Sequence, residues 1–126
     1  MSRAAIRLAC LVVGILCAPA DIGAGEPPRI AIVRAPVFVS EGEWIRVFVQ
    51  VTPHPDNLAF ILAAVDEGGT VRQSLVQLEG DTAARSWWID WREGLPAGEL
   101  ELVAVLITKT GQGPLARRSI HVLARR

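Results

Sequence analysis

One stretch, residues 86–107, leaves few folds open to this chain. Within Ser86–Trp91, Trp87, Ile89 and Trp91 alternate with Ser86, Trp88 and Asp90, which is the period of a strand with one buried face. Three turn-forming residues follow, Gly94, Pro96 and Gly98. From Leu100 to Ile107 apolar residues occupy both parities, as in a strand that lies inside a sheet with both faces covered. The stretch therefore predicts two strands joined by a corner.

The rest of the chain repeats this style of patterning. Alternation and turn residues recur every ten or so positions, and no long segment shows the three-and-four spacing of an amphipathic helix. The expected strands are 29–33 with its continuation 37–39 after Pro36, then 44–51, 58–65, 70–78, 86–91, 100–107 and 115–123. Within 44–51 the expected core residues are Ile45, Val47, Val49 and Val51. The polar segment 70–78 suits a sheet edge. We predict an all-β, two-layer antiparallel sandwich of about seven strands.

The corner carries a resemblance to a known superfamily. It reads Leu95-Pro96-Ala97-Gly98-Glu99-Leu100-Glu101-Leu102. This resembles the corner before a long strand in immunoglobulin-like and fibronectin-type-III-like sandwiches of exported bacterial proteins. Leu100 stands where that superfamily has a corner tyrosine, so the tyrosine's hydrogen bond to the backbone is missing here. The resemblance implies the fold and no particular activity.

The first residues have the pattern of an export signal. Arg3 and Arg7 precede an apolar run, and Ala18-Pro19-Ala20 offers small residues for cleavage. The alternative, a membrane anchor, needs roughly 20 apolar residues, and this run is broken earlier. We expect a signal peptide at 1–20 with cleavage near 20–24, a linker at 21–28, the sandwich at 29–123 and a tail at 124–126. The mature form is then periplasmic or extracellular and does not span a membrane.

Both cysteines, Cys10 and Cys17, lie in the expected signal peptide, so the mature chain is predicted to fold without a disulfide. Basic and acidic residues balance at 13 each, and the basic residues are scattered. A scattered distribution gives no basic patch, so no nucleic-acid partner is expected.

The sequence offers little for catalysis or metal binding. The mature chain has two histidines, His54 in a loop and His121 on the last strand, and no elbow motif around a serine. Neither zinc-ligand spacing nor a calcium loop is present. We therefore predict no enzyme activity, no cofactor and no metal, with His54 a solvated loop residue.

The aromatic residues are the remaining candidates for a site, because the chain has four tryptophans and no tyrosine. Alternation places Trp87 and Trp91 in the core and Trp88 outside, on the same side as Trp44 and Phe48. Trp44, Phe48 and Trp88 are the candidate binding residues, since exposed aromatic side chains anchor partner proteins or stack on sugars. The alternative, which we favour, is that arginine and glutamine stems cover the two outer tryptophans. The function predicted is protein recognition or a structural accessory role in the cell envelope or outside the cell; the alternative is a carbohydrate-binding module.

Overall fold

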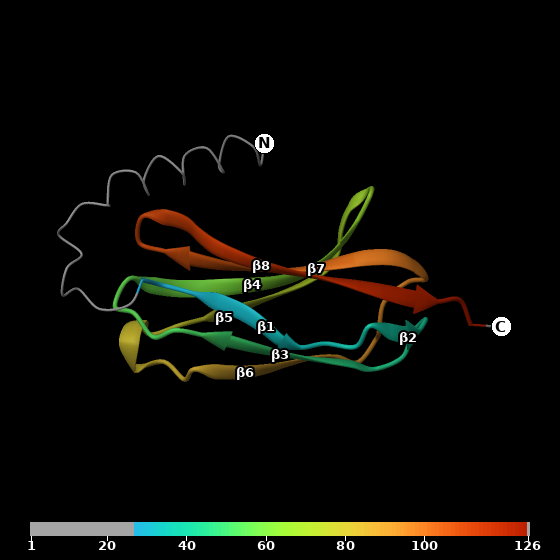
Figure 1. The fold of residues 1–126 in the computed structure, drawn as a ribbon, viewed down its shortest axis with the longest axis horizontal. Helices are drawn as coiled ribbons and strands as arrows, with labels where there is room; N and C mark the ends of the chain where they lie inside the picture. The colour runs from blue at the N-terminus through green and yellow to red at the C-terminus, as the bar shows by residue number, and fades with distance from the viewer. Residues whose placement is uncertain (1–26, 126) are drawn as a thin grey trace.

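The computed structural model describes residues 27–125, which form eight strands in two facing sheets (Figure 1). The strands are β1 (Ile30–Arg34), β2 (Phe38–Ser40), β3 (Ile45–Val51), β4 (Asn57–Asp66), β5 (Gly69–Gln77), β6 (Ser86–Trp91), β7 (Gly98–Thr108) and β8 (Gly111–Leu123). A single 3-10 turn, η2 (Gly80–Thr82), interrupts this order within the described part. The predicted all-β sandwich is confirmed. The expected signal peptide and both cysteines lie outside the described residues.

The two sheets have the strand orders β1-β3-β6 and β2-β8-β7-β4-β5. All pairs are antiparallel except β2 with β8. The strand count is eight and not seven because the first extended segment divides at Pro36: β1 pairs with β3 in one sheet, and β2 pairs with β8 in the other. Proline has no N–H to continue a ladder, so the chain changes sheets at this point, as the sequence predicted.

Alternate residues of each strand point into a shared core between the sheets. The four predicted core residues of β3, from Ile45 to Val51, are all buried. Other side chains with no exposed surface are Phe60, Leu62, Leu102, Leu106 and Ile120. Full burial of such a side chain stabilises the fold by roughly 1.5–3 kcal/mol. This core is the main source of stability, because the described residues contain no cysteine for a disulfide.

The corner predicted from the sequence joins the two sheets. It leads from β6 at one edge of the three-stranded sheet to β7 inside the five-stranded sheet. Gly94 has a φ of +73° and lies against the turn at Gly42, whose N–H donates to the carbonyl of Leu95 at 3.1 Å. Leu100, which follows the corner, is buried in the core.

The five-stranded sheet corrects one expectation about burial. Residues 58–65 and 100–107 do lie on interior strands, and β5 is an edge, as predicted. The outer face of β7 is not fully covered, however: its residues Val103, Val105 and Ile107 are only half-buried. Their neighbours across the strands are apolar too: Val105 lies in register with Ile61 of β4.

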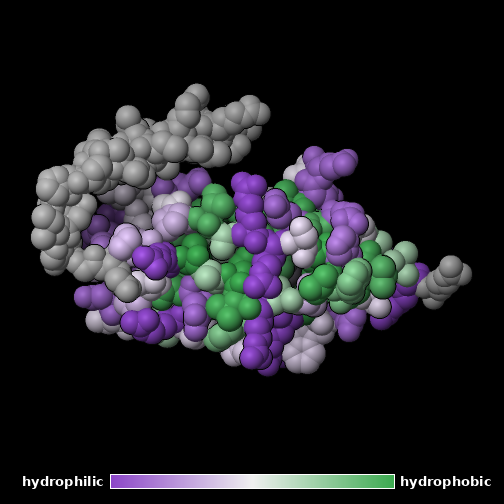
Figure 2. Space-filling model, in the orientation of Figure 1, coloured by the Kyte–Doolittle hydropathy of each residue, from purple (hydrophilic) through white to green (hydrophobic). Residues whose placement is uncertain are grey.

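Apolar side chains also reach the surface at the ends of strands. Val37, Phe38 and Leu123, which lie near the pairing of β2 with β8, are each more than half exposed. On the side of the molecule where β1 and β8 are nearest the viewer, hydrophobic atoms form several patches with a hydrophilic band between them (Figure 2). Hydrophobic surface alone therefore does not single out one site.

Candidate functional site

The three candidate binding residues meet on the outer face of the three-stranded sheet. Trp44 immediately precedes β3, Phe48 lies within it, and Trp88 is the residue of β6 directly opposite Phe48. Opposite residues of an antiparallel pair point to the same face, which is why positions 40 residues apart in sequence come into contact. The predicted grouping of Trp44, Phe48 and Trp88 on one face is what the register produces.

Two arginines lie between and beside these rings. The rings of Phe48 and Trp88 stack with centroids 4.4 Å apart and planes 28° apart. The guanidinium carbon of Arg46 lies 5.2 Å from the centroid of Trp88 and 5.6 Å from that of Trp44. Arg92 lies over Trp44 at 5.5 Å. The side chains thus follow one another as Arg92, Trp44, Arg46, Trp88 and Phe48, and we call this row the aromatic–arginine strip.

Arg46 is held in the strip by an acidic neighbour. Its Nε donates to Oδ1 of Asp90 at 2.9 Å, and a terminal nitrogen donates to Oδ2 at 3.4 Å. Asp90 is the residue of β6 opposite Arg46 in the ladder. This hydrogen bond, with the Arg46 charge, lowers the pKa of Asp90, and the same contact raises the pKa of Arg46. Two bonds in a fork fix the plane of the guanidinium between the two tryptophan rings.

Trp44 and Trp88 are partly covered by neighbouring side chains and partly exposed to solvent. Trp44 is 53% exposed and Trp88 is 49% exposed, while Phe48 is half-buried beneath its neighbours. Arginines do pack over the rings, as the covered arrangement predicted, but about half of each tryptophan still faces solvent. Sequence reasoning missed Arg46, Asp90 and Arg92 as members of the site. The alternation that placed Trp44, Phe48 and Trp88 outward places these three on the same face.

The other two tryptophans belong to the interior side of β6. Trp91 is buried, and its Nε1 donates to Oγ of Ser74 at 2.8 Å. Trp87 is half-buried, donates to the carbonyl of Ala84, and meets the edge of Phe60 with centroids 6.1 Å apart. The predicted core position of Trp91 is confirmed, and that of Trp87 holds for the side of its ring that faces Phe60.

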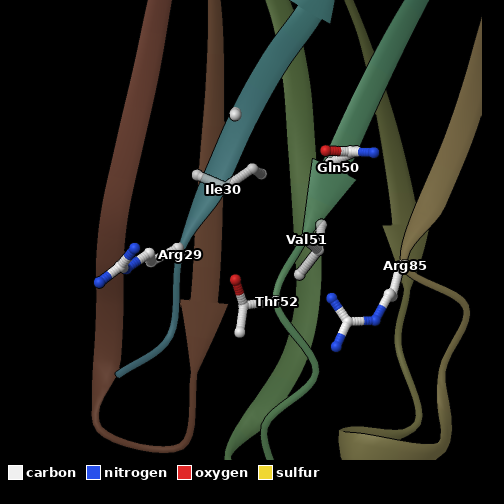
Figure 3. Close-up of a pocket in the computed structure, with 7 residues that line it drawn as sticks. Arg29, Ile30, Gln50, Val51, Thr52 and Arg85 are labelled. Carbon is white, nitrogen blue, oxygen red and sulfur yellow. The ribbon is translucent and has the colours of Figure 1, made fainter. Parts of the chain in front are cut away.

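A hollow of about 230 Å³ lies at the far end of the same sheet, where β1 and β3 meet the residue before β6. Figure 3 shows its lining side chains: Arg29, Ile30, Gln50, Val51, Thr52 and Arg85. Arg85 extends its guanidinium toward Val51 and Thr52, whereas Arg29 points away from it (Figure 3). The two guanidiniums therefore do not converge on a common point, and the aromatic–arginine strip is the better-defined site.

The histidines are engaged in local contacts. Nδ1 of His54 accepts a hydrogen bond from the backbone N–H of Asp56 at 3.0 Å, and its side chain is 21% exposed. His54 is therefore a loop residue that is only partly solvated, because the loop engages one of its ring nitrogens. His121 contacts Glu99 at 2.8 Å and stacks on Phe38. Between residues 27 and 125 no three metal-ligating side chains of the His, Cys, Asp or Glu type are grouped together.

Comparisons with known proteins bear on the fold. No protein-family model matches the sequence, and no curated protein matches it. Among solved structures, the chain is similar to the CARDB domain of a Pyrococcus furiosus protein, determined in complex with di-metal ions, with a TM-score of 0.50 and 12% identity over 79% of this chain and 94% of that one.

Two further solved structures are more distant. A lipoprotein from Bacteroides thetaiotaomicron gives a TM-score of 0.48 and 18% identity, covering 80% of this chain and 84% of that one. A chitin binding domain from Burkholderia pseudomallei gives 0.45 and 11%, covering 71% and 57%.

At such identities the likeness concerns the fold. The sheet orders and the similarity to the CARDB domain agree, at the level of the fold, with the predicted immunoglobulin-like sandwich. No helix in the described part of the chain is long and apolar enough to cross a membrane.

Proposed function

We propose that the aromatic–arginine strip is a recognition surface for a partner protein, and that the domain acts by binding, without catalysis of its own. The observation that supports this most directly is the pair of half-exposed tryptophans, Trp44 and Trp88, with Arg46 between them. Tryptophan and arginine are the side chains most enriched among residues that dominate binding energy in protein interfaces. The predicted signal peptide would place this partner in the periplasm or outside the cell.

The order within the strip favours tight binding. A side chain that must be immobilised on association costs about 0.5–1.5 kcal/mol. Here Arg46 is already fixed by Asp90, and Trp88 is already stacked on Phe48. A partner that docks on these rings therefore loses less binding energy to ordering than it would on free side chains.

The alternative function is carbohydrate binding on the same tryptophans. A sugar ring stacks on one free face of an aromatic ring, and half-exposed tryptophans can supply such a face. Arg46 and Phe48 already contact the Trp88 ring, and two arginines contact the Trp44 ring. These contacts reduce the ring surface left for a sugar, so we place protein recognition first.

Affinity capture from a cell-envelope extract tests the proposal. The immobilised protein is compared with the variant Trp88→Ala and with the control Leu75→Ala, which truncates a residue 61% exposed on the other sheet. We expect a partner that binds the unmodified protein and the Leu75→Ala variant equally and is lost from Trp88→Ala. A partner retained equally by all three would show that the strip is not the binding surface.

Tryptophan fluorescence separates the two functions. Stacking of a sugar on Trp44 or Trp88 changes the surroundings of the indole ring, so titration with chitin fragments or cell-wall polysaccharides should shift the emission if the domain binds glycans. We expect no saturable change with these polymers. A saturable shift that disappears in Trp88→Ala would favour the carbohydrate-binding function.

A further inference from the structure

Strand β6 forms one edge of the three-stranded sheet. β6 pairs with β3 on one side, and no strand of the described chain pairs with it on the other. Val51 N–H donates to the carbonyl of Arg85, its direct partner in the register shared by β3 and β6. Main-chain groups alternate in direction along a strand, so Trp87, Ile89 and Trp91 also bond to β3. The N–H and C=O groups of Ser86, Trp88 and Asp90 therefore point to the open edge.

The other three edge strands carry features that hinder pairing with another chain. β1 has a register shift between Ile32 and Arg34, which leaves Val33 as an extra residue. β5 has a similar shift, with Val71 as the extra residue opposite Ala64 and Val65. β2 is only three residues long and follows Pro36. Bulges, short strands and proline are among the means by which natural sheets prevent edge-to-edge association.

β6 has none of these features. Its six residues pair with β3 in regular register, and they include no proline, glycine or lysine. Three of the six are tryptophans, which have a high preference for strands. The edge of β6 is therefore the one along which an added strand would meet the least resistance.

The residues at this edge are complementary to themselves. Two copies of β6 that pair antiparallel about a two-fold axis must match residues of the set Ser86, Trp88 and Asp90, because only these have free main-chain groups. The register that uses all three places Trp88 opposite Trp88 and Ser86 opposite Asp90. Each such pair exchanges two main-chain hydrogen bonds. Asp90, the one charged residue of the set, then faces a serine, so no like charges are opposed.

We propose that the protein forms a dimer through antiparallel pairing of β6 with β6 of a second copy, with Trp88 on the two-fold axis. The interface is isologous and closes on itself. It joins the two three-stranded sheets into one continuous sheet of order β1-β3-β6-β6-β3-β1. Because the pairing is made by the main chain, it does not depend on whether the aromatic–arginine strip binds a partner protein.

Sedimentation velocity over a range of concentrations measures the association. The main comparison is between Trp88→Pro and Trp88→Ala. Both remove the indole, but only proline removes the N–H that points to the open edge, and proline is tolerated on edge strands where the N–H faces solvent. We expect the unmodified protein and Trp88→Ala to dimerise with rising concentration and Trp88→Pro to remain monomeric. Circular dichroism checks that each variant retains its strands.

Two further variants make the test independent of the fold of Trp88→Pro. Ser86→Pro removes another free N–H at the open edge and should also prevent dimerisation. The variant Trp88→Cys, made with Cys10→Ser and Cys17→Ser, should form a covalent dimer on mild oxidation. Its two Cα atoms would lie about 5.5 Å apart, within the range that a disulfide spans. Gln50→Cys in the same background, on the same face but on the inner strand β3, is the control and should form no disulfide-linked dimer.

The sedimentation and cross-linking results either support the dimer or overturn it. Association that persists in Trp88→Ala and is lost in Ser86→Pro or Trp88→Pro, together with cross-linking at position 88 and not at position 50, supports the dimer. A protein that is monomeric at its highest soluble concentration overturns it. Equal association of Trp88→Ala and the folded proline variants also overturns it, since the contact would then lie elsewhere. Capture of a partner by the strip would not alter either conclusion.

Discussion

A single methyl group at Gly94 tests how the corner joins the two sheets. Gly94 has a φ of +73°, which residues with a side chain rarely adopt. A Cβ at this position would lie 2.3 Å from the carbonyl carbon of Gly42 and 2.6 Å from its Cα. These are backbone atoms, so they cannot rotate away as a flexible side chain would.

Gly42 is a matched control. Its φ of +77° is nearly the same, but a Cβ added there meets nothing within 4 Å. For Gly42→Ala we expect a loss of about 1–2 kcal/mol from the left-handed conformation alone. For Gly94→Ala the same loss is increased by overpacking, which costs about 1–3 kcal/mol, so a total of about 2–5 kcal/mol is expected.

Urea unfolding followed by tryptophan fluorescence measures both variants. The difference between them isolates the close approach of the corner to the turn at Gly42, because the contribution of φ is common to both. Equal losses of stability in the two variants would refute the reasoning. They would mean that the corner moves away from the turn at little cost, and that the contact between residues 42 and 95 does not fix the sheets.

Two other predictions concern the aromatic–arginine strip. The hydrogen bond from Arg46 lowers the pKa of Asp90 in the folded state. The ionised Asp90 therefore contributes stability above its unfolded pKa, and this contribution is lost as the pH falls through the folded pKa. The difference in urea midpoint between the unmodified protein and Asp90→Asn should shrink on acidification, and a difference independent of pH would contradict the pairing. Acrylamide should quench the fluorescence of Trp44 and Trp88 strongly and that of Trp91 weakly, in line with their exposure. The double variant Trp44→Phe, Trp88→Phe should lose most of this quenching. Unchanged quenching would show that the outer tryptophans are not accessible.

The positions of the strands, and the face to which each side chain points, could be predicted from the sequence because side chains alternate between the two faces of a strand. Alternation in residues 44–51 was enough to place Ile45, Val47, Val49 and Val51 in the core and Trp44 and Phe48 outside. It failed to show that β7 has an uncovered outer face. Apolar residues on both parities indicate an interior strand, but only the arrangement of layers decides whether anything packs on the second face.

The strip illustrates the same division. The sequence grouped Trp44, Phe48 and Trp88 by parity, yet it could not give the register of β3 with β6, which is set by pairing between distant segments. Only that register puts Trp88 opposite Phe48 and Asp90 opposite Arg46. The contact between the two arginines and the rings follows from it, which is why Arg46 and Arg92 were not recognised beforehand.

By itself the sequence determined that the described chain folds as extended strands, where the chain turns, and which side of most strands is apolar. These are local properties, fixed by the spacing of side chains and by the backbone preferences of glycine and proline. The tertiary structure decided which strands are neighbours, that the first strand divides between two sheets, and which edge is left open at β6. Those features depend on contacts between residues far apart in the chain, and no local pattern records them.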